Sequence, residues 1–470
     1  MNLRSLVHRA TAPKSRRSFD AASSGRGWGQ QRPFGGTSAE TLAAFSPIRA
    51  RARAAHANNP HARAAVEAWV SALVGTGARA TPTHPDPVRR EAIALAIEIW
   101  TGEADADGRS DWYGLQANIA RAMVIDGEAL VLLIDTPDGL RLRQIPSELL
   151  DESETRSFSD GRQTVGGVEF NAAGQRVAYW IRPEAPTSPF STGAAAVRVD
   201  AANVLHVFKP LGAGQVRGVS WLAPVLLKLS EIDQLSDALL VGLKTSAMFA
   251  GFLKDTTGAT SEFPFDGDRA GSIMTDGLEP GTLKVLPSGY DISFATPAQA
   301  QQSPDFLSAE LRAVAVGMGV PAHLVSGDLR QANYSSLRAD MVAFRQRVSQ
   351  IQYGTLAPQL LRPVHARAVR SLVLTGTLNA PAFETRPSEW TGAEWIFAAP
   401  PGVDPKKDAE ALRELMDAGL MSRREAVAER GWNVEALDAE IAADRAREAA
   451  LGLTFGTNPQ SKEPGNAGNA

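Results

Sequence analysis

The stretch from Ser303 to Ser336 constrains the fold most strongly, because it places one short polar loop between two helices. Ser303 can accept hydrogen bonds from the free amides of a first helical turn and Pro304 fits the first helical position, so a helix is predicted from Ser303 to Gly317 or Gly319. Residues 325–336 are nearly all small, polar or turn-forming, and an apolar helical pattern begins again at Leu337. No set of catalytic side chains surrounds this loop, which indicates a segment that must be held in place.

The same stretch carries a resemblance to a known family. GVPAHLVSGDLRQANYSSLRA, residues 319–339, is similar to the signature around the tunnel loop of the lambda-type portal proteins of tailed bacteriophages, a hairpin that projects into a DNA channel. Four more segments resemble that family in the same order: RARARAAHANNPHARAAVEAWVSALVGTGARATP (49–82), DGEALVLL (126–133), GQVRGVSWLAPVL (214–226) and GVDPKKDAEALRELMDAGLMSRREAVAERGWN (402–433). Five ordered motifs over most of the chain are much harder to obtain by coincidence than one.

The resemblance implies an α+β portal fold with an α/β wing, a helical stem, a small β-containing clip and a helical crown. Its parts are a basic, disordered N-terminal arm (1–48), the wing (49–219), a first stem helix (220–248), the clip (249–302), a second stem helix (303–319), the tunnel loop (320–336), helices that connect wing and crown (337–402), the crown (403–452) and a disordered tail (453–470).

The resemblance also implies two groups of residues that face DNA. The tunnel-loop group is Gly327, Asp328, Leu329, Arg330, Gln331, Ala332, Asn333, Tyr334, Ser335 and Ser336. The channel-lining group on the stem is Lys228, Glu231, Asp233, Asp237 and Lys244.

The charge of the stem supports a conduit on physical grounds. Residues 221–247 carry three carboxylates against two lysines, whereas a surface that grips duplex DNA is rich in Lys and Arg. A slightly negative wall, repeated around a ring, would repel the duplex, while the two lysines could offer weak phosphate contacts. A solvated helix face with ordinary mixed charges explains the same residues when they are taken singly.

The implied function is that of a portal subunit, copies of which form a dodecameric ring at one capsid vertex for genome packaging, retention and ejection. The implied partners are other copies of the chain, transiently and non-specifically bound double-stranded DNA, the terminase large subunit, the major capsid protein and head-completion or adaptor proteins. No membrane, cofactor or catalysis of its own is implied, and the location is the virion, assembled in the host cytoplasm. Two other classes stay open: a non-portal phage enzyme or head adaptor, and a cellular α/β scaffold.

Composition narrows these classes. With 470 residues and 44% hydrophobic content, the chain can bury one large core or several smaller ones. No apolar run approaches the roughly 18 residues of a membrane span, and no secretory signal is recognisable. The absence of cysteine excludes disulfides and thiolate metal sites, and seven scattered histidines leave little for a zinc centre. A folded protein of the reducing cytoplasm, or of a virion assembled there, is expected.

The positive charge is concentrated at the N-terminus. The whole chain has a net charge of -4, but residues 1–55 hold ten Lys and Arg against Asp20 and Glu40, a net of +8. Such a segment fits a transit peptide, an arm that binds nucleic acid, or a solvated disordered tail. The family resemblance favours a packaging or shell contact over organelle targeting.

Between the tails, periodicity predicts a mixture of helices and short strands. Helices are expected at 59–74, 87–100, 110–125 with Ser110 as N-cap, 220–248 and from Leu337. A further helical segment, punctuated by Pro358 and Pro363, is expected to end near Thr375. Strands are expected at 129–135, 140–145, 167–170, 176–182, 204–209, 249–254, 283–286 and 290–294. A coil with Trp390 and Trp395 leads to a helical crown, with N-caps at Asp404 and at Ser422, whose capping box is completed by Glu425.

Catalytic and ligand motifs are incomplete. Glu103, Asp105 and Asp107 resemble the front of a calcium loop, but its twelfth position holds Gly114, so a solvated acidic turn is expected. GAGQVRG (212–218) has Arg217 where a dinucleotide loop needs its last glycine. His206 lies in a β-rich segment and is expected in the core or on a sheet face.

Three further motif classes fail as well. Lys244 and Thr245 lack the preceding glycine of a phosphate loop, and no HExxH occurs. Ser220 and Ser326 lack the flanking glycines of a nucleophile elbow. No active site is therefore predicted.

Overall fold

The structure is a computed structural model, and it describes residues 39–184, 193–248, 252–255, 269–270, 273–274, 290–293, 303–330, 333–398 and 405–453. Its helices are α1 (Ala39–Asn58), α2 (Pro60–Leu73), α3 (Pro87–Glu103), α4 (Trp112–Ile125), α5 (Leu226–Met248), α6 (Ser303–Met318), α7 (Ala322–Ser326), α8 (Tyr334–Ile351), a π-helix η5 (Gln352–Leu361), α9 (Arg362–Leu374), α10 (Pro387–Thr391), α11 (Pro405–Asp417), α12 (Arg423–Glu429) and α13 (Val434–Leu451), with short 3₁₀ turns η2 (Ser147–Leu149) and η3 (Ala201–Asn203).

The strands form five sheets in the described parts of the chain. They are β1 (Arg79–Pro82) with β14 (Ala393–Ile396); β2 (Glu128–Thr136) between β3 (Gly139–Ile145) and β9 (Val204–Phe208); the antiparallel series β4 (Arg156–Ser157), β5 (Gln163–Val165), β6 (Val168–Phe170), β7 (Arg176–Ile181) and β8 (Val197–Asp200); β10 (Phe252–Asp255) with β13 (Tyr290–Ser293); and β11 (Arg269–Ala270) with β12 (Ile273–Met274).

Strand β2 is buried on both of its faces and divides the core in two. Because successive side chains of a strand point to opposite faces, Ala129, Val131 and Leu133 join the large helical core, while Leu130 joins a smaller one with Leu150 and residues of the five-stranded sheet. Helix α4, η5 and α9 contact the β3-β2-β9 sheet. The alternation therefore makes β2 the centre of the wing and confirms the predicted α+β class.

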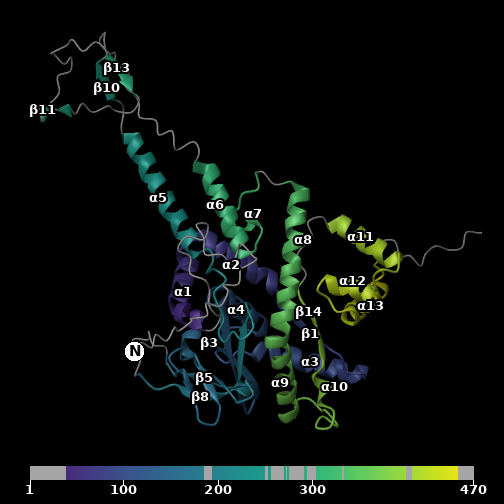
Figure 1. The fold of residues 1–470 in the computed structure, drawn as a ribbon. Coiled ribbons are helices and arrows are strands. Elements are labelled where there is room, and N and C mark those ends of the chain that lie inside the picture. Colours follow the sequence, from purple (N-terminus) through teal and green to yellow (C-terminus); the bar gives the residue numbers. More distant parts are fainter. Residues whose placement is uncertain are drawn as a thin grey trace, which may run out of the picture.

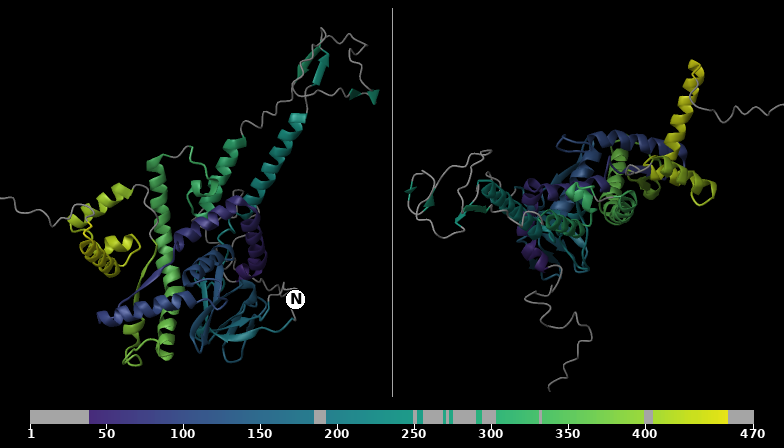
Figure 2. Two further views of the ribbon diagram at one scale, coloured as in Figure 1. Left: turned by 180° about the vertical axis from the view of Figure 1, so that it is seen from behind. Right: turned by 90° about the horizontal axis from the view of Figure 1, so that it is seen from above.

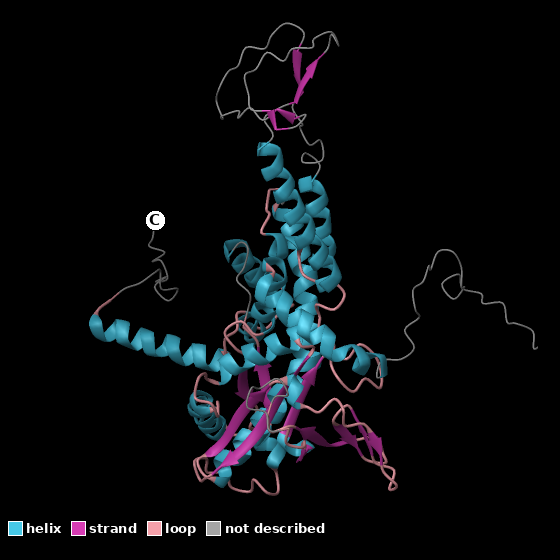
Figure 3. Ribbon diagram, turned by 90° about the vertical axis from the view of Figure 1, so that its left-hand side faces the viewer, coloured by secondary structure: helices cyan, strands magenta, loops and turns pink. Residues whose placement is uncertain are grey.

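Two helices project from this body side by side. Helices α5 and α6 leave one end of the molecule, and the β10–β13 pair lies beyond the far end of α5 (Figure 1). The sheets of the wing lie at the opposite end, as Figure 3 shows. Helices α11, α12 and α13 form a small group beside α8. Along the chain, the projecting helix α5, the β10–β13 pair, helix α6 and the group α11–α13 follow one another in this order, with β13 before α6.

Most predicted elements are present with shifts of a few residues. The predicted strands at 129–135, 140–145 and 204–209 are β2, β3 and β9, and the capping box of Ser422 with Glu425 is confirmed at the start of α12. The predicted strand at 283–286 and the N-cap Asp404 lie outside the described residues. The interpretation of residues 390–395 as coil is wrong, because Trp390 lies in α10 and Trp395 in β14, which pairs with β1.

Three predicted boundaries are wrong for identifiable reasons. The N-terminal arm is predicted to extend to residue 48, but α1 begins at Ala39. The segment is rich in alanine, which favours helix, and Phe45 is buried beneath the Arg49 guanidinium. The cap of α4 is Asp111, whose carboxylate accepts from the amide of Gly114, while the Ser110 amide donates to Asp105.

The stem helix begins at Leu226 rather than at Ser220. The Trp221 amide donates across the fold to the carbonyl of Val124 at 3.0 Å, which holds residues 221–225 in turns before the helix starts. The start of α5 is therefore fixed by a tertiary contact that no local pattern reveals.

A buried charged cluster holds the segment that leads into the stem. Glu128 and Arg217 are both fully buried, and the Arg217 Nε donates to Glu128 Oε1 at 2.9 Å. Buried His206 contacts Glu128 through Nε2 at 2.9 Å, and the Gly218 amide donates to the same carboxylate. The charge of Arg217, together with the hydrogen bonds from Arg217 and His206, outweighs burial and holds the pKa of Glu128 well below its usual range. Burial lowers the pKa of His206.

We predict that Arg217→Ala destabilises the protein by about 3–5 kcal/mol, because it leaves Glu128 as an uncompensated buried charge. Denaturant unfolding of the purified variant measures this. Arg386→Ala is the control: Arg386 forms an exposed pair with Glu389 at 3.4 Å, and its loss should cost less than about 1 kcal/mol. Equal effects of the two substitutions would contradict the structural importance of the cluster.

Candidate DNA-channel interface

The two stem helices pack closely because a glycine lies at their contact. The buried side chains of α5 and of the preceding turn, Leu222, Val225, Leu229 and Ile232, join those of α6, Val314, Ala315 and Met318, in one core. A Cβ atom on Gly317 would lie far inside van der Waals contact of the Val225 Cγ1 atom. The β-branched Val225 has little rotameric freedom with which to avoid such a clash. Gly317 therefore sets the distance between the stem helices.

An aromatic cluster joins the stem to the wing. The Trp69 ring of α2 makes edge contacts with Trp221 and with Phe344 of α8, at 5.0 Å between centroids in each case. The buried indole Nε1 of Trp69 donates to the carbonyl of Met318, the last residue of α6, at 2.9 Å. This bond satisfies one of the free carbonyls at the end of that helix. Trp69 thus fixes α6 relative to α2 and α8.

The base of the predicted tunnel loop is fastened at both sides. Arg347 of α8 donates to the carbonyl of Gly319 at 2.9 Å, and His61 of α2 hydrogen-bonds to the carbonyl of Val325 at 3.0 Å. Gly327 ends the short helix α7 with a φ of 67°, a left-handed conformation that glycine adopts without strain. The loop therefore leaves a rigid base in one defined direction.

The loop is shorter than predicted. Asn333 caps α8: its side chain accepts from the Ser336 amide at 2.8 Å, and the Ser336 hydroxyl accepts from the Asn333 amide at 3.2 Å. Tyr334, Ser335 and Ser336 are therefore the first turn of a helix, and assigning them to the loop is wrong. A serine closes this capping box in place of the usual Glu or Gln, so the helix start was missed. Gln331 and Ala332 lie outside the described residues.

The exposed part of the loop carries no net charge. Asp328 and Arg330 pair at 2.8 Å, and the Arg330 amide also donates to the Asp328 carboxylate. These bonds lower the pKa of Asp328 to about 2. Leu329, between them, is 55% exposed. Because Asp328 offsets the charge of Arg330, the exposed part of the loop has no net positive charge with which to attract phosphates.

The predicted stem residues do not form one cluster. Lys228 pairs with Glu310 of α6, and the Asn59 side chain, which also caps α2, donates to Asp233 at 2.9 Å. Glu231, Asp237 and Lys244 are exposed. At 100° per residue, Asp233, Asp237 and Lys244 share one side of α5, and Lys228 lies on another. Two of the five predicted residues therefore bind helices of their own subunit.

The stem of a single subunit also exposes a large apolar surface. Leu227, Leu240, Val241 and Leu243 of α5, Phe306 and Val316 of α6, and Val342 of α8 are at least 48% exposed. So many exposed apolar side chains on two projecting helices and their neighbour are compatible with contact to another macromolecule.

The alternative sites do not assemble in the structure. Asp105 accepts from the amides of Asp107, Arg109 and Ser110, and no group of three or more metal-ligating side chains occurs among the described residues. Arg217, in the glycine-rich segment, is buried in the wing, as is His206, which confirms a core histidine. In the part of the chain that the structure describes, every helix is too short or too polar to cross a membrane.

A family of known proteins matches most of the chain. Residues 24–352 match the family described as "Phage portal protein, lambda family". The match covers more than half of the chain, which therefore belongs to this family of phage portal proteins.

The chain is similar to named portal proteins along most of its length. It is 25% identical to the probable portal protein of Halomonas phage phiHAP-1 (81% of this chain, 74% of that protein) and 23% identical to the portal protein of Escherichia phage N15 (92% and 89%). It is 22% identical to portal protein B of Escherichia phage lambda (64% and 62%). Together with the family match, this similarity over most of the chain makes the protein a portal subunit.

Solved structures give a more distant likeness. A chain from the virion of a native gene transfer agent particle has a TM-score of 0.46 at 16% identity, covering 88% of this chain and 95% of that one. A chain from the neck of an empty gene transfer agent particle has a TM-score of 0.47 at 17% identity, covering 87% and 94%.

We predict opposite effects of two glycine-to-alanine substitutions in the stem. Gly317→Ala should destabilise the protein by about 1–3 kcal/mol, because the methyl group overpacks the α5–α6 contact. Gly242→Ala, on the exposed part of α5 with no atom within 4 Å of the new Cβ, should stabilise it by about 0.5–1 kcal/mol. Denaturant unfolding measures both, and a stabilising Gly317→Ala would contradict the packing described above.

Proposed function

We propose that copies of this subunit form a dodecameric ring whose axial channel carries double-stranded DNA during packaging, retention and ejection. The observation that carries the proposal is the loop 327–333, which has no net charge and whose base is fastened by Arg347 of α8 and His61 of α2. A loop held at a fixed place without net charge can touch passing DNA without gripping it. In this proposal the ring occupies one capsid vertex of a virion assembled in the host cytoplasm.

The exposed apolar side chains of the stem support the ring. Leu240, Val241 and Phe306 would be covered by neighbouring stems, so that α5 and α6 of adjacent copies form the channel wall. Asp237 and Lys244, which have no partner among the described residues, are then the stem charges best placed to meet DNA. Lys228 and Asp233 instead fix the stem to its own subunit.

The remaining partners follow from the family. The segment 249–302, of which the structure describes four short strands, is proposed as the clip that docks the terminase large subunit and later the head-completion or adaptor proteins. The major capsid protein would contact the outside of the ring. We propose a purely structural role without catalysis, because the motifs of an enzyme are incomplete in the sequence. The alternative of a non-portal enzyme would need a reaction centre. The alternative of a head adaptor would need an assembly other than the portal ring.

We predict that replacing residues 328–332 with a Gly/Ser linker leaves rings intact but reduces packaged DNA severalfold, because the loop no longer limits movement of the duplex. Asn333 is kept, since it caps α8. The amount of DNA retained in particles after nuclease treatment measures the loss of packaging. Negative-stain microscopy of the purified variant shows whether rings still form.

A matched control replaces an equally exposed turn, residues 172–174 between β6 and β7, with the same linker. Normal packaging by the loop variant would remove the tunnel-loop assignment. Failure of the loop variant to form rings would show that the loop acts in assembly.

A further inference from the structure

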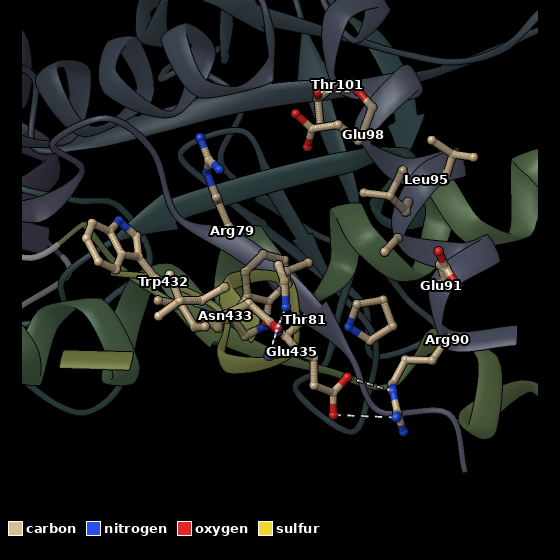
Figure 4. A pocket seen from close by; sticks show the side chains of 18 of the residues that line it. Arg79, Thr81, Arg90, Glu91, Leu95, Glu98, Thr101, Trp432, Asn433 and Glu435 are labelled. Carbon is tan, nitrogen blue, oxygen red and sulfur yellow. Dashed lines mark hydrogen bonds and ion pairs between the residues drawn. The ribbon is translucent and has the colours of Figure 1, made fainter. Parts of the chain in front are cut away.

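A cleft separates the crown from the wing on the side of the subunit away from α1. Its walls are β1 and α3 of the wing and α13 with the turn before it, and its volume is about 1070 Å³ (Figure 4). Two polar contacts cross it: Arg90 pairs with Glu435 at 3.4 Å, and Asn433 donates to Thr81 at 3.3 Å. Because α13 buries none of its residues, the cleft is held open rather than packed.

The cleft is acidic and partly apolar. Five carboxylates and two guanidinium groups line it, and Arg90 is already paired with Glu435. Glu91 and Glu440 have no partner among the described residues, while Glu98 accepts from the phenol of Tyr113 at 3.1 Å. Leu95 and Trp432 are 63% and 58% exposed beside them. The matching ligand is a cationic segment that also carries aromatic side chains.

Two buried nitrogens among the lining residues lack a hydrogen-bond partner. They are Nε1 of Trp395 and Nε2 of His365, whose rings meet edge to face at 5.8 Å. An unpaired buried donor or acceptor costs free energy, so a carbonyl or an amide that enters the cleft deeply enough to reach these nitrogens would be favoured. A peptide backbone supplies both groups.

We propose that the cleft binds the N-terminal arm, residues 1–38, of a second copy of the chain. The arm carries seven Lys and Arg against Asp20 alone, and its aromatic residues Phe19, Trp28 and Phe34 stand near arginines in the sequence. Its charge of +6 complements the surplus of carboxylates. The C-terminal segment 454–470, with one lysine and one glutamate, does not.

The position of α1 favours the cleft of a second copy over that of the same chain. Helix α1 begins directly after the arm. It lies on the opposite side of the subunit from α13 in Figure 1 and in the reverse view at the left of Figure 2. Helix α1 therefore lies on the far side of the subunit from the cleft of its own chain. At roughly 3.3–3.6 Å per extended residue, 38 residues can span more than 100 Å, enough to reach an adjacent subunit.

The absence of cysteine allows a direct test in the full-length protein. Ala94→Cys places one thiol on the cleft wall of α3, where a benzophenone maleimide can be attached. After illumination, we expect a cross-linked band of twice the subunit mass that contains peptides of residues 1–38. Neutralising the cleft with Glu91→Gln, Glu98→Gln, Glu440→Gln and Asp444→Asn should reduce the yield roughly tenfold, and moderate salt should reduce it too.

The control neutralises Glu410, Glu414 and Asp417 of α11, which do not line the cleft, and should leave the yield unchanged. Circular dichroism of both variants establishes that they are folded. Cross-links to other segments, to the arm within one chain, or to the arm with a yield that ignores the cleft carboxylates would each overturn the proposal. Equal loss in the control would also overturn it, because the effect would then be one of total charge.

Discussion

The buried ion pair between Glu128 and Arg217 is the contact on which the arrangement of this subunit depends. Glu128 begins the central strand of the wing, and Arg217 lies in the segment that leads to the stem. Its guanidinium also donates to the carbonyl of Gly166, at the turn between β5 and β6. One side chain thus ties together the two cores of the wing and the start of α5, and a shift there would move the whole stem.

The close backbone approach around this pair gives the contact its precision. A Cβ atom on Gly218 would overlap the carbonyl of Gly127, which itself has a φ of 93°. The stem entrance and the central strand can lie this close only because both positions are glycine. From that fixed point, Trp221 meets Trp69, Trp69 holds the end of α6, and α8 holds the base of the loop. The position of the loop is therefore fixed by contacts that begin in the wing.

The elements could be predicted from the sequence where the signal is local, and the site only in part. Helix α6 and strands β2, β3 and β9 follow from caps and periodicity. The capping box of Asn333 with Ser336 was missed because its third residue is not acidic, and β1 and β14 were missed because short strands far apart in sequence carry no shared local pattern.

The stem charges were predicted as one group, yet Lys228 and Asp233 are used within the subunit. Such pairings depend on tertiary distances that composition cannot reveal. The role of Gly317 in helix packing could not be predicted either, because the sequence presents it only as a candidate helix end. The burial of Arg217 could not be predicted, because arginine is rarely buried in proteins.

The central claim is that this subunit builds a ring with the loop 327–333 at its axis. A cryo-electron microscopy map of the purified full-length protein tests it most directly. We expect a closed ring with an axial hole, α5 and α6 of adjacent copies packed through Leu240, Val241 and Phe306, and Leu329 facing the lumen. A monomer, or a ring with this loop on its outer surface, would contradict it.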